Sequence, residues 1–435
     1  MNKTLTAILA AILTLTMLSA CGPTSNHSAK EDLPKPENNS GNSTITEPPP
    51  TEDSKTSTTA YKEFPKPIGN YTVGRTQMDF KYTASDHSER ELTALFFYPS
   101  DSDEGKPTAE YAFPEFHSLR NELLAKLGAP TGEPLFDSDF KTWTYEDLTL
   151  SKKEQQYPVL FFVHGAGAYP QQGTLFAQDL ASSGYIVVSI GHAESGVYKL
   201  KDGRTMAMTE QFMTELTKYG MEAATLTPPE IVTNKLGEEA AMEISRKLTS
   251  APEATKFSKY AVLQSEDVSY VADHLYKMNA GELDSEFEGR LQLDIGMGVF
   301  GHSFGGTTAA IVSRDDERFV GAVNLDGNMV GALDSDLKKP YMQLGTVLAH
   351  NTNAFLLETN SDDTYFAIID DVIHGDFSDS MFTTTNQATR GTRDAMEQRD
   401  IITSYTKAFF DRYLLKQEAD IESLTFDGVE MIKKP

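Results

Sequence analysis

The sequence has little cysteine, little positive charge and no long apolar run. Cys21 is the only cysteine in 435 residues, so a disulfide within the chain is excluded as a source of stability. Lysine and arginine total 38 against 64 aspartate and glutamate residues, which gives a formal net charge of −26 at pH 7. A field of this sign repels phosphate backbones and strongly anionic bilayers. We therefore expect no nucleic-acid partner, whereas neutral or zwitterionic ligands meet no such barrier.

An apolar stretch near the N-terminus, Leu5 to Leu18, follows Lys3. At about 14 residues it is short for a membrane span, which needs about 20, and it has the form of an export signal. It ends in Leu18-Ser-Ala-Cys21-Gly22, which resembles a bacterial lipoprotein box. The resemblance implies that residues 1–20 are a signal peptide and that Cys21 is the lipidation site. The protein is then expected to be lipid-anchored in the bacterial cell envelope, facing outside the cytoplasm. The alternative is a plain signal peptide in which the cysteine has no role.

Residues 21–65 have the composition of a tether. They are mostly Ser, Thr, Asn, Pro and Glu, and they include Pro48-Pro49-Pro50. With almost no large apolar side chains, such a segment cannot bury enough surface to offset the entropy lost on folding. We expect a disordered linker up to residue 65 and a folded domain over residues 66–435.

Short apolar runs alternate with amphipathic stretches through the rest of the chain. Residues 158–163 are apolar throughout, which is typical of a strand buried on both faces. Such strands alternating with helices predict an α/β fold with a mainly parallel central sheet flanked by helices. The predicted strands cover residues 71–82, 92–98, 158–163, 185–190, 297–300, 320–325, 341–344 and 365–369, with helices near 174–182 and 396–415.

Residues 196–262 interrupt this alternation, because no strand-like run occurs there. Phe212, Leu216 and Tyr219 recur at helical spacing, so we expect a helical insertion before the strand at 297–300. Two roles are open for it: packing on the sheet edge, or a cap over the active site whose methionines offer adaptable apolar surface to acyl chains. We favour packing with partial substrate contact.

Gly301-His302-Ser303-Phe304-Gly305 matches the G-x-S-x-G nucleophile elbow. A predicted buried strand leads into it and a helix-forming segment leads out of it. This context places the serine hydroxyl above the sheet, where the helix N-terminus favours negative charge. The pattern predicts an α/β-hydrolase fold with Ser303 as a nucleophile; the alternative is a glycine-rich turn after a strand.

A serine nucleophile needs a base, and in this fold the histidine comes last in the chain. Only His350 and His374 follow Ser303. His374 lies in a loop directly after the strand at 365–369, from which it can reach the elbow, so we assign it as the base. We assign His350, in a segment that reads as a helix start, to a surface or helix-capping role.

The base in turn needs an orienting carboxylate. Many hydrolases carry it after the strand that here is 341–344, yet residues 345–357 contain no Asp or Glu. Asp326, directly after the strand at 320–325, is therefore preferred. Asp362 and Asp363 are the fallback, although they also suit a turn before the next strand.

An oxyanion hole requires backbone N–H groups aimed at the developing charge. We assign the amides of Phe304 and of Ala166, which lies in the glycine-rich loop after residues 158–163. His164 is expected to brace that loop and His302 to be structural, while His192 is a weaker candidate for approaching the site. The sequence has no metal-ligand pattern, Walker loop or dinucleotide fingerprint, so we expect neither metal nor cofactor.

Several motifs together are similar to those of one family. They are Tyr71-Thr-Val-Gly74, Phe97-Tyr-Pro-Ser100, Phe162-Val-His-Gly-Ala-Gly167, Asp179-Leu-Ala-Ser-Ser-Gly-Tyr185, Gly301-His-Ser-Phe-Gly-Gly306 and Leu325-Asp326. From about residue 71 to 415 the chain resembles the platelet-activating-factor acetylhydrolases, also called lipoprotein-associated phospholipases, and their bacterial relatives in the α/β-hydrolase superfamily. The family's serine, aspartate and histidine fall on Ser303, Asp326 and His374, and its oxyanion donors on Ala166 and Phe304.

The resemblance implies a calcium-independent serine esterase that works through an acyl-enzyme. Its substrates would be phospholipids with short or oxidised sn-2 acyl groups, as for a 1-alkyl-2-acetylglycerophosphocholine esterase. A broad-specificity carboxylesterase, or a polyester or lipid esterase without phospholipid preference, is the alternative. A catalytically inactive surface lipoprotein that binds lipids is the rival from another class. The sequence leaves the oligomeric state open.

Overall fold

The computed structural model describes residues 61–126, 135–137, 139–331, 336–384 and 390–434. The predicted signal peptide, the lipidation site Cys21 and the tether up to residue 60 lie outside these residues. The packed structure begins before the predicted boundary at residue 66. Phe64 is buried, with its ring centroid 5.5 Å from that of Tyr111 and 4.9 Å from that of Phe140. Composition missed this boundary because a single aromatic residue in a Pro- and Lys-rich segment is enough to fill a gap in an aromatic cluster.

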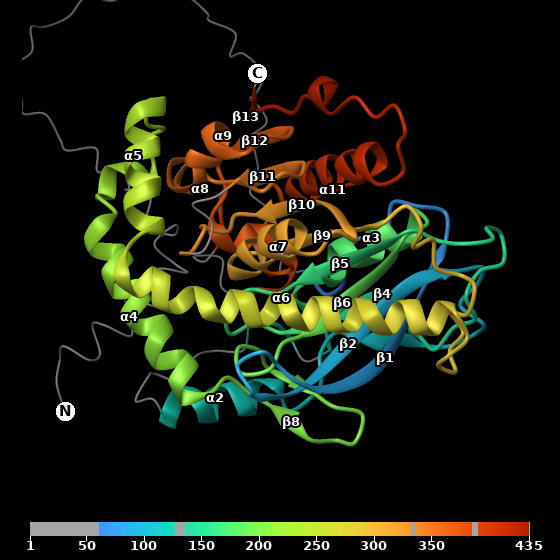
Figure 1. Ribbon diagram of the computed structural model, residues 1–435. Helices are drawn as coiled ribbons and strands as arrows, with labels where there is room; N and C mark the ends of the chain where they lie inside the picture. The colour runs from blue at the N-terminus through green and yellow to red at the C-terminus, as the bar shows by residue number, and fades with distance from the viewer. Residues whose placement is uncertain (1–60, 127–134, 138, 332–335, 385–389, 435) are drawn as a thin grey trace, which may run out of the picture.

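Within the described residues, an eleven-stranded sheet runs in the order β13-β12-β11-β10-β9-β5-β6-β2-β1-β4-β3 (Figure 1). The strands are β1 Thr72–Thr83, β2 Glu89–Ser100, β3 Thr108–Glu110, β4 Lys141–Glu146, β5 Val159–Val163, β6 Ile186–Gly191, β9 Met297–His302, β10 Phe319–Leu325, β11 Tyr341–Gly345, β12 Thr364–Ile369 and β13 Val429–Lys433. β7 Tyr198–Lys199 and β8 Thr205–Met206 form a separate hairpin. The α-helices are α2 Phe116–Lys126, α3 Thr174–Ser182, α4 Glu210–Leu226, α5 Glu238–Thr249, α6 Pro252–Asn279, α7 Phe304–Asp315, α8 Val347–Asn353, α9 Phe355–Thr359, α10 Ser380–Thr383 and α11 Ala395–Tyr413. Short 3-10 helices are η1 Pro170–Gly173, η2 Pro229–Val232, η3 His374–Phe377 and η5 Ile421–Ser423.

The centre of the sheet is parallel, from β6 through β5, β9, β10 and β11 to β12. β1, β2 and β13 add antiparallel pairs on either side. The predicted mainly parallel sheet flanked by helices is therefore confirmed. The sequence did not predict β3, β4 or β13, which lie toward the sheet edges. β4 buries Thr142 and Thr144 rather than apolar residues, so it shows no apolar run.

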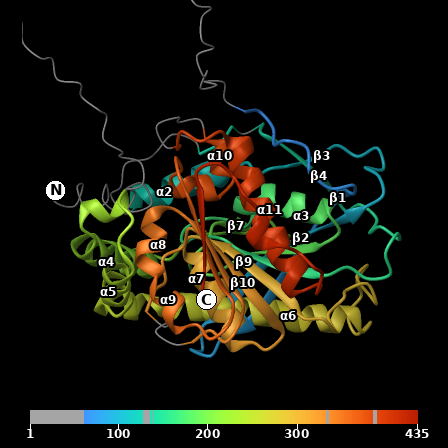
Figure 2. The ribbon, with the colours of Figure 1, turned by 90° about the horizontal axis from the view of Figure 1, so that it is seen from above.

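Two cores sandwich the sheet, because alternate side chains of each buried strand point to opposite faces. In β5, Val159, Phe161 and Val163 pack in the core with α6 and α7. Leu160 and Phe162 pack in the other core with α3 and α11. Figure 2 shows α3 and α11 together on one side of the sheet and α6 along the other. The sheet is thus covered on both faces, and its carboxyl edge is left to the loops.

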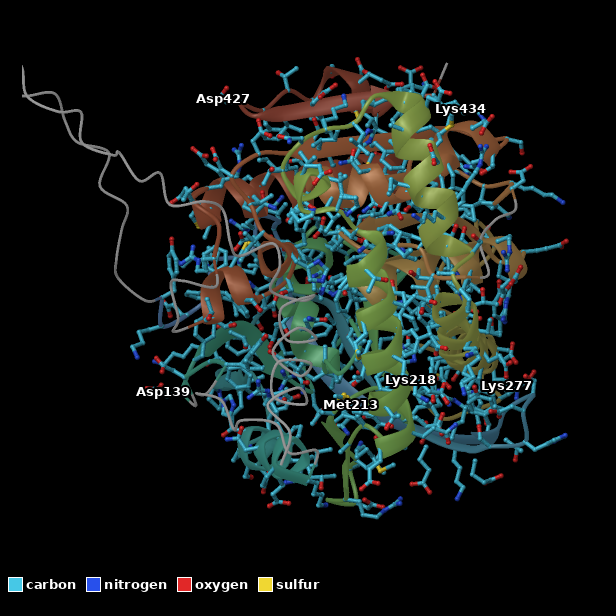
Figure 3. The ribbon with its side chains drawn as sticks, turned by 90° about the vertical axis from the view of Figure 1, so that its left-hand side faces the viewer. Asp139, Met213, Lys218, Lys277, Asp427 and Lys434 are labelled. Carbon is cyan, nitrogen blue, oxygen red and sulfur yellow. The ribbon has the colours of Figure 1, made fainter. Side chains whose placement is uncertain are left out.

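The segment predicted as a helical insertion contains α4, η2, α5 and the start of α6. Figure 3 shows α4 and α5 across one side of the molecule, with Met213 and Lys218 labelled on α4. Two details differ from the sequence-based expectation. The hairpin β7–β8 lies at the start of the insertion. No strand was predicted there, because a strand of two residues leaves no recognisable pattern in the sequence. α6 continues unbroken through the predicted limit at residue 262 to Asn279, where it covers the sheet.

Candidate active site

Ser303 lies at the sharp turn between β9 and α7. Its backbone has φ 57° and ψ −125°, in a region that residues with a side chain rarely adopt. The neighbouring glycines make the turn possible by close approach. A Cβ on Gly301 would lie 2.2 Å from the carbonyl oxygen of Gly305, and one on Gly305 would lie 2.1 Å from that of Val163. The strand, turn and helix predicted around the elbow are therefore all present.

The structure brings together the three side chains that the sequence analysis singled out. His374 opens η3, directly after the β12 strand and its following turn. Its Nε2 lies 2.9 Å from Ser303 Oγ, and its Nδ1 lies 2.7 Å from Asp326 Oδ2. Asp326 is 3% exposed and follows β10, which neighbours β9 in the sheet. The geometry allows a proton to pass from the serine hydroxyl to an imidazole that the carboxylate orients.

Sequence reasoning missed a second partner of Asp326. The Thr346 backbone N–H and hydroxyl donate to Asp326 Oδ1, with donor–acceptor distances of 2.7 and 2.9 Å. Thr346 follows β11, at the position where an acid was sought and found absent. The only signal in the sequence was that absence, which does not by itself identify a hydrogen-bond donor.

The loop that carries His374 is held by buried polar contacts. His302 Nε2 donates to the His374 carbonyl oxygen over 3.0 Å, and the Asp376 carboxylate accepts from the backbone N–H groups of Ile373 and Gly391. Burial lowers the pKa of His302 to about 3, so its ring is neutral at pH 7. Burial also raises the pKa of Asp376 above its ordinary value. The expectation that His302 is structural agrees with these contacts.

The loop after β5, residues 164–168, faces the serine. The N–H groups of Gly165, Gly167 and Ala168 donate to Gln172 Oε1, the Ser195 carbonyl and the Gly165 carbonyl, respectively. No partner for the Ala166 N–H occurs among the described residues. Phe304 opens α7, so its N–H lacks a partner within the helix. Both residues line the cavity at Ser303, which leaves these two amides available to an oxyanion.

Two buried histidines lie behind this loop. His164 Nδ1 donates to the Gly165 carbonyl over 2.7 Å, and its Nε2 accepts from the His192 backbone N–H over 3.3 Å. Burial lowers the pKa of His164 to about 3 and also lowers the pKa of His192, so both rings are neutral at pH 7. His192 Nδ1 lies 2.9 Å from a carboxylate oxygen of buried Asp267. His192 thus supports the loop from behind and does not line the cavity at Ser303.

A cavity of about 100 Å³ opens onto Ser303 and His374. It is small beside the roughly 300–1,000 Å³ of sites that hold drug-sized ligands. Apolar residues of three helices, α4, α6 and α8, form much of its wall. These residues are Leu216, Tyr219 and Gly220 of α4, Phe257 of α6, and Leu348 and Ala349 of α8. The insertion therefore forms part of the cavity wall as well as packing on the core.

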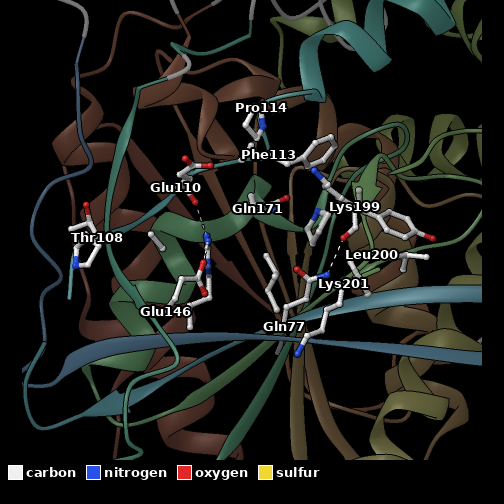
Figure 4. A pocket seen from close by; sticks show the side chains of 18 of the residues that line it. Gln77, Thr108, Glu110, Phe113, Pro114, Glu146, Gln171, Lys199, Leu200 and Lys201 are labelled. Atoms are coloured by element: carbon white, nitrogen blue, oxygen red, sulfur yellow. Dashed lines mark hydrogen bonds and ion pairs between the residues drawn. The ribbon is translucent and has the colours of Figure 1, made fainter. Parts of the chain in front are cut away.

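A larger cavity, of about 780 Å³, lies apart from the triad against β1 and β2 (Figure 4). Arg75, which lines this cavity, is paired with Glu146 and donates to the Glu110 carbonyl over 2.9 Å. Lys199 pairs with the Glu115 carboxylate over 3.1 Å. None of the triad residues lines this cavity, so we place the candidate active site at the smaller one.

The remaining candidates lie elsewhere. His350 is 5% exposed, inside α8 and against Phe366, so the prediction of a surface or capping role was wrong. Thr346 provides the cap of that helix instead. Asp362 and Asp363 directly precede β12, which agrees with the alternative role considered for them, a turn before that strand.

The described part of the chain offers neither a candidate metal site nor a candidate membrane-spanning helix. No group of three or more His, Cys, Asp or Glu side chains there is placed to hold a metal ion. Over the same residues, no helix combines the length and the apolar character that crossing a membrane requires.

The chain matches a known family over most of its length. The family model for platelet-activating factor acetylhydrolase, isoform II, matches residues 56–424. The chain belongs to this family. That assignment confirms the resemblance seen in the motifs from residue 71 onward.

Known relatives agree with this assignment, and a solved structure shares the fold. The dog platelet-activating factor acetylhydrolase is 26% identical over 284 residues, 61% of this chain and 55% of the dog protein. The chain thus spans about half the length of the dog and bovine proteins that it matches. The chicken protein of the same name is 23% identical over 83% of this chain and 86% of its own. A ferulic acid esterase from Streptomyces cinnamoneus superposes with a TM-score of 0.60 at 19% identity, over 86% of this chain and 100% of that one. At this identity the superposition shows the shared α/β-hydrolase fold.

Proposed function

We propose that the protein is a serine ester hydrolase acting on phospholipids with short or oxidised sn-2 acyl groups. The observation that carries the proposal is the hydrogen-bonded series from Asp326 through His374 to Ser303 at the base of a small cavity. Membership of the platelet-activating factor acetylhydrolase family supports the substrate class.

The mechanism follows from the roles that the geometry permits. His374 Nε2 takes the proton of Ser303 as its Oγ bonds to the ester carbonyl carbon, and Asp326 stabilises the resulting imidazolium. The negative charge on the former carbonyl oxygen is held by the N–H groups of Ala166 and Phe304. The imidazolium then protonates the leaving alcohol as the ester bond breaks. Water, deprotonated by the same histidine, releases the acid from the serine and restores the enzyme.

The size of the cavity supports a short acyl group. At about 100 Å³, and closed by Leu216 and Tyr219 of α4, it has no room for a long acyl chain without a change of shape. A broad carboxylesterase is the second candidate, because an apolar cavity of this size would also accept short esters that carry no phosphate. We also propose that Cys21 anchors the enzyme by a lipid in the bacterial envelope, as the lipoprotein-box resemblance implies.

Replacing the nucleophile tests the chemistry. Ser303→Ala should abolish hydrolysis of p-nitrophenyl butyrate and labelling by an organophosphate, while the unfolding midpoint stays near that of the wild type. Activity at the wild-type level in this variant would refute the serine mechanism. A panel of acetyl, butyryl and long-chain esters, compared with short sn-2 phospholipids, then separates the two substrate classes by kcat/KM.

A further inference from the structure

The two proposed oxyanion donors belong to separate segments of the chain. Ala166 lies in the 164–168 loop after β5, and Phe304 begins α7 after β9. An oxyanion hole acts only when both N–H groups meet the same oxygen atom at about 2.7–3.1 Å. The spacing between the loop and α7 is therefore a catalytic variable, and it must be set by contacts behind the site.

Gln264 of α6 contacts the supports of both segments. Its Nε2 donates to Ser195 Oγ over 2.8 Å, and its Oε1 accepts from the Thr308 hydroxyl over 2.7 Å. Thr308 lies on α7, little more than one turn beyond Phe304. All three side chains are buried, with exposures of 1% for Gln264 and Ser195 and 0% for Thr308. One amide thus uses a donor and an acceptor to bridge α7 and the segment that contains Ser195.

That segment, residues 191–197, is joined directly to the 164–168 loop. The Ser195 carbonyl accepts from the N–H of Gly167, the neighbour of Ala166, over 2.8 Å. The Val197 N–H donates to the Ala168 carbonyl over 2.8 Å. Both bonds are made by the two residues that follow Ala166, so a shift of Ser195 would move the Ala166 N–H as well.

α6 fixes the same segment a second time, one turn further along. Asp267 accepts from His192 Nδ1 over 2.9 Å and from Arg90 Nε and Nη2 over 2.5 and 2.6 Å. Arg90 Nη2 also donates to the Ala193 carbonyl over 3.3 Å. Asp267 therefore anchors residues 191–197 to α6 and Arg90. Gln264 differs from Asp267 in that it also contacts α7, through Thr308.

We propose that Gln264 is a positioning residue that sets the spacing between the Ala166 and Phe304 amides. The proposal rests on the serine-hydrolase function proposed above. It assigns a catalytic consequence to a buried side chain on a helix that also covers the sheet and contributes Phe257 to the cavity wall.

Gln264→Met is the direct test, because methionine has a similar length and flexibility but forms neither hydrogen bond. We expect kcat for p-nitrophenyl butyrate to fall about 10- to 100-fold, up to the roughly 100-fold cost of a 1 Å misplacement and below the roughly 100- to 1,000-fold cost of losing an oxyanion donor outright. KM should stay within about threefold, because the donors act on the charge that develops in the transition state. Organophosphate labelling to completion counts the folded active sites, so kcat is expressed per competent serine.

Gln178→Met is the matched control. Gln178 is also a buried helical glutamine with two hydrogen bonds to other segments, from the Trp143 N–H and to the Pro65 carbonyl, and neither leads to the site. Both variants should lower the unfolding midpoint, but only Gln264→Met should lower kcat. If kcat per labelled serine is the same in the two variants, Gln264 is merely structural and the proposal fails.

Ser195→Ala completes a double-mutant cycle. It removes the hydroxyl that Gln264 holds, so kcat should fall in the same direction, and the double variant should be little slower than Gln264→Met alone. Effects on kcat that multiply independently would overturn the coupling. These outcomes are distinct from failure of the proposed function, in which Ser303→Ala itself stays active.

Discussion

Thr346 determines how the Asp326 carboxylate is presented to His374. Two donors from this one residue engage Oδ1, which leaves Oδ2 directed at the imidazole. A carboxylate held in this way keeps the ring of His374 in one orientation, and orientation is a large part of what the acid of a triad contributes. The residue takes no part in bond making, yet its contacts belong to the site.

Thr346→Val tests this role, since it removes the hydroxyl and keeps the backbone N–H. We expect kcat to fall by about tenfold, equivalent to about 1.4 kcal/mol, a typical loss for one hydrogen bond to a charged group. Steady-state kinetics on a p-nitrophenyl ester measures it. Thr364→Val is the control, because Thr364 is also buried and its hydroxyl bonds Asn360 and Asp362 instead. Equal kcat in the two variants would show that the Thr346 hydroxyl does not orient the acid.

His302 makes the stability of the elbow depend on pH. Burial depresses its pKa from 6.5 to about 3, so the unfolded state binds one more proton than the folded state between these values. Stability from this group is present above pH 6.5 and is lost as the pH falls toward 3. The loss amounts to about 1.4 kcal/mol for each pH unit.

His302→Gln should therefore flatten the acid side of the stability profile. Its amide can still donate to the His374 carbonyl, but it cannot be protonated. Urea unfolding at pH 4, 5, 6 and 7 should show a slope smaller by about one proton than in the wild type. If the two slopes are equal, the ring of His302 takes up its proton without unfolding.

A residue of the site could be predicted from the sequence when the pattern that identifies it lies in the residues next to it. Ser303 follows from five consecutive residues, and His374 from chain order and its place after a strand. Asp326 needed an argument by elimination. Thr346 and Gln264 left no sequence signal, because a threonine after a strand and a glutamine in a helix are common, and their importance lies in partners distant in the chain.

At the scale of elements, α4 forms part of the wall of the cavity in which the proposed mechanism places the acyl group. Leu216 and Tyr219 stand on the face of α4 that closes the cavity, and the Tyr219 ring stacks on Phe257 of α6 with centroids 5.3 Å apart. This stack packs α4 against α6 and so fixes the position of this wall of the cavity. Under the proposed function, the insertion and not the sheet would therefore set the length of acyl chain that fits.

Leu216→Ala should widen the acceptance of longer chains. Removing this side chain enlarges the cavity, and each accommodated methylene is worth about 1–3 kcal/mol in such a pocket. We expect the ratio of kcat/KM for octanoyl over acetyl p-nitrophenyl esters to rise at least about tenfold. Met221→Ala, on the same helix but 41% exposed, should leave the ratio unchanged. An unaltered ratio in Leu216→Ala would place the acyl group elsewhere.

Most of the strands that sequence patterns predicted are buried, although β1, also predicted, has only four buried residues in twelve. Strands β5, β6 and β9 to β12 have all or nearly all of their residues buried and read as apolar runs. β13 has no fully buried residue, and β7 and β8 have two residues each, so hydrophobicity could not identify them. The role of the insertion was open for a related reason, because an amphipathic helix has the same pattern whether its apolar face meets a core or a substrate.

At the scale of the whole molecule, the net charge of −26 bears on the surfaces the enzyme can approach. An anionic bilayer repels a protein of this charge over roughly one Debye length, which is about 10 Å at 0.1 M salt and about 3 Å at 1 M. The proposed phosphocholine-type substrates are zwitterionic and carry no such penalty. Charge therefore favours zwitterionic interfaces independently of the active site.

Vesicle composition and salt together test this. A short sn-2 phospholipid carried in anionic vesicles should be hydrolysed more slowly than in zwitterionic vesicles at low salt, because fewer enzyme molecules reach the surface. Raising the salt to about 1 M should narrow the difference, since screening removes the repulsion. Hydrolysis of a soluble p-nitrophenyl ester, measured in parallel, should change little with salt and so reports on the chemistry alone. If the phospholipid is hydrolysed as fast in anionic as in zwitterionic vesicles at low salt, the net charge does not control binding to the vesicle surface. A local part of the protein surface then controls it.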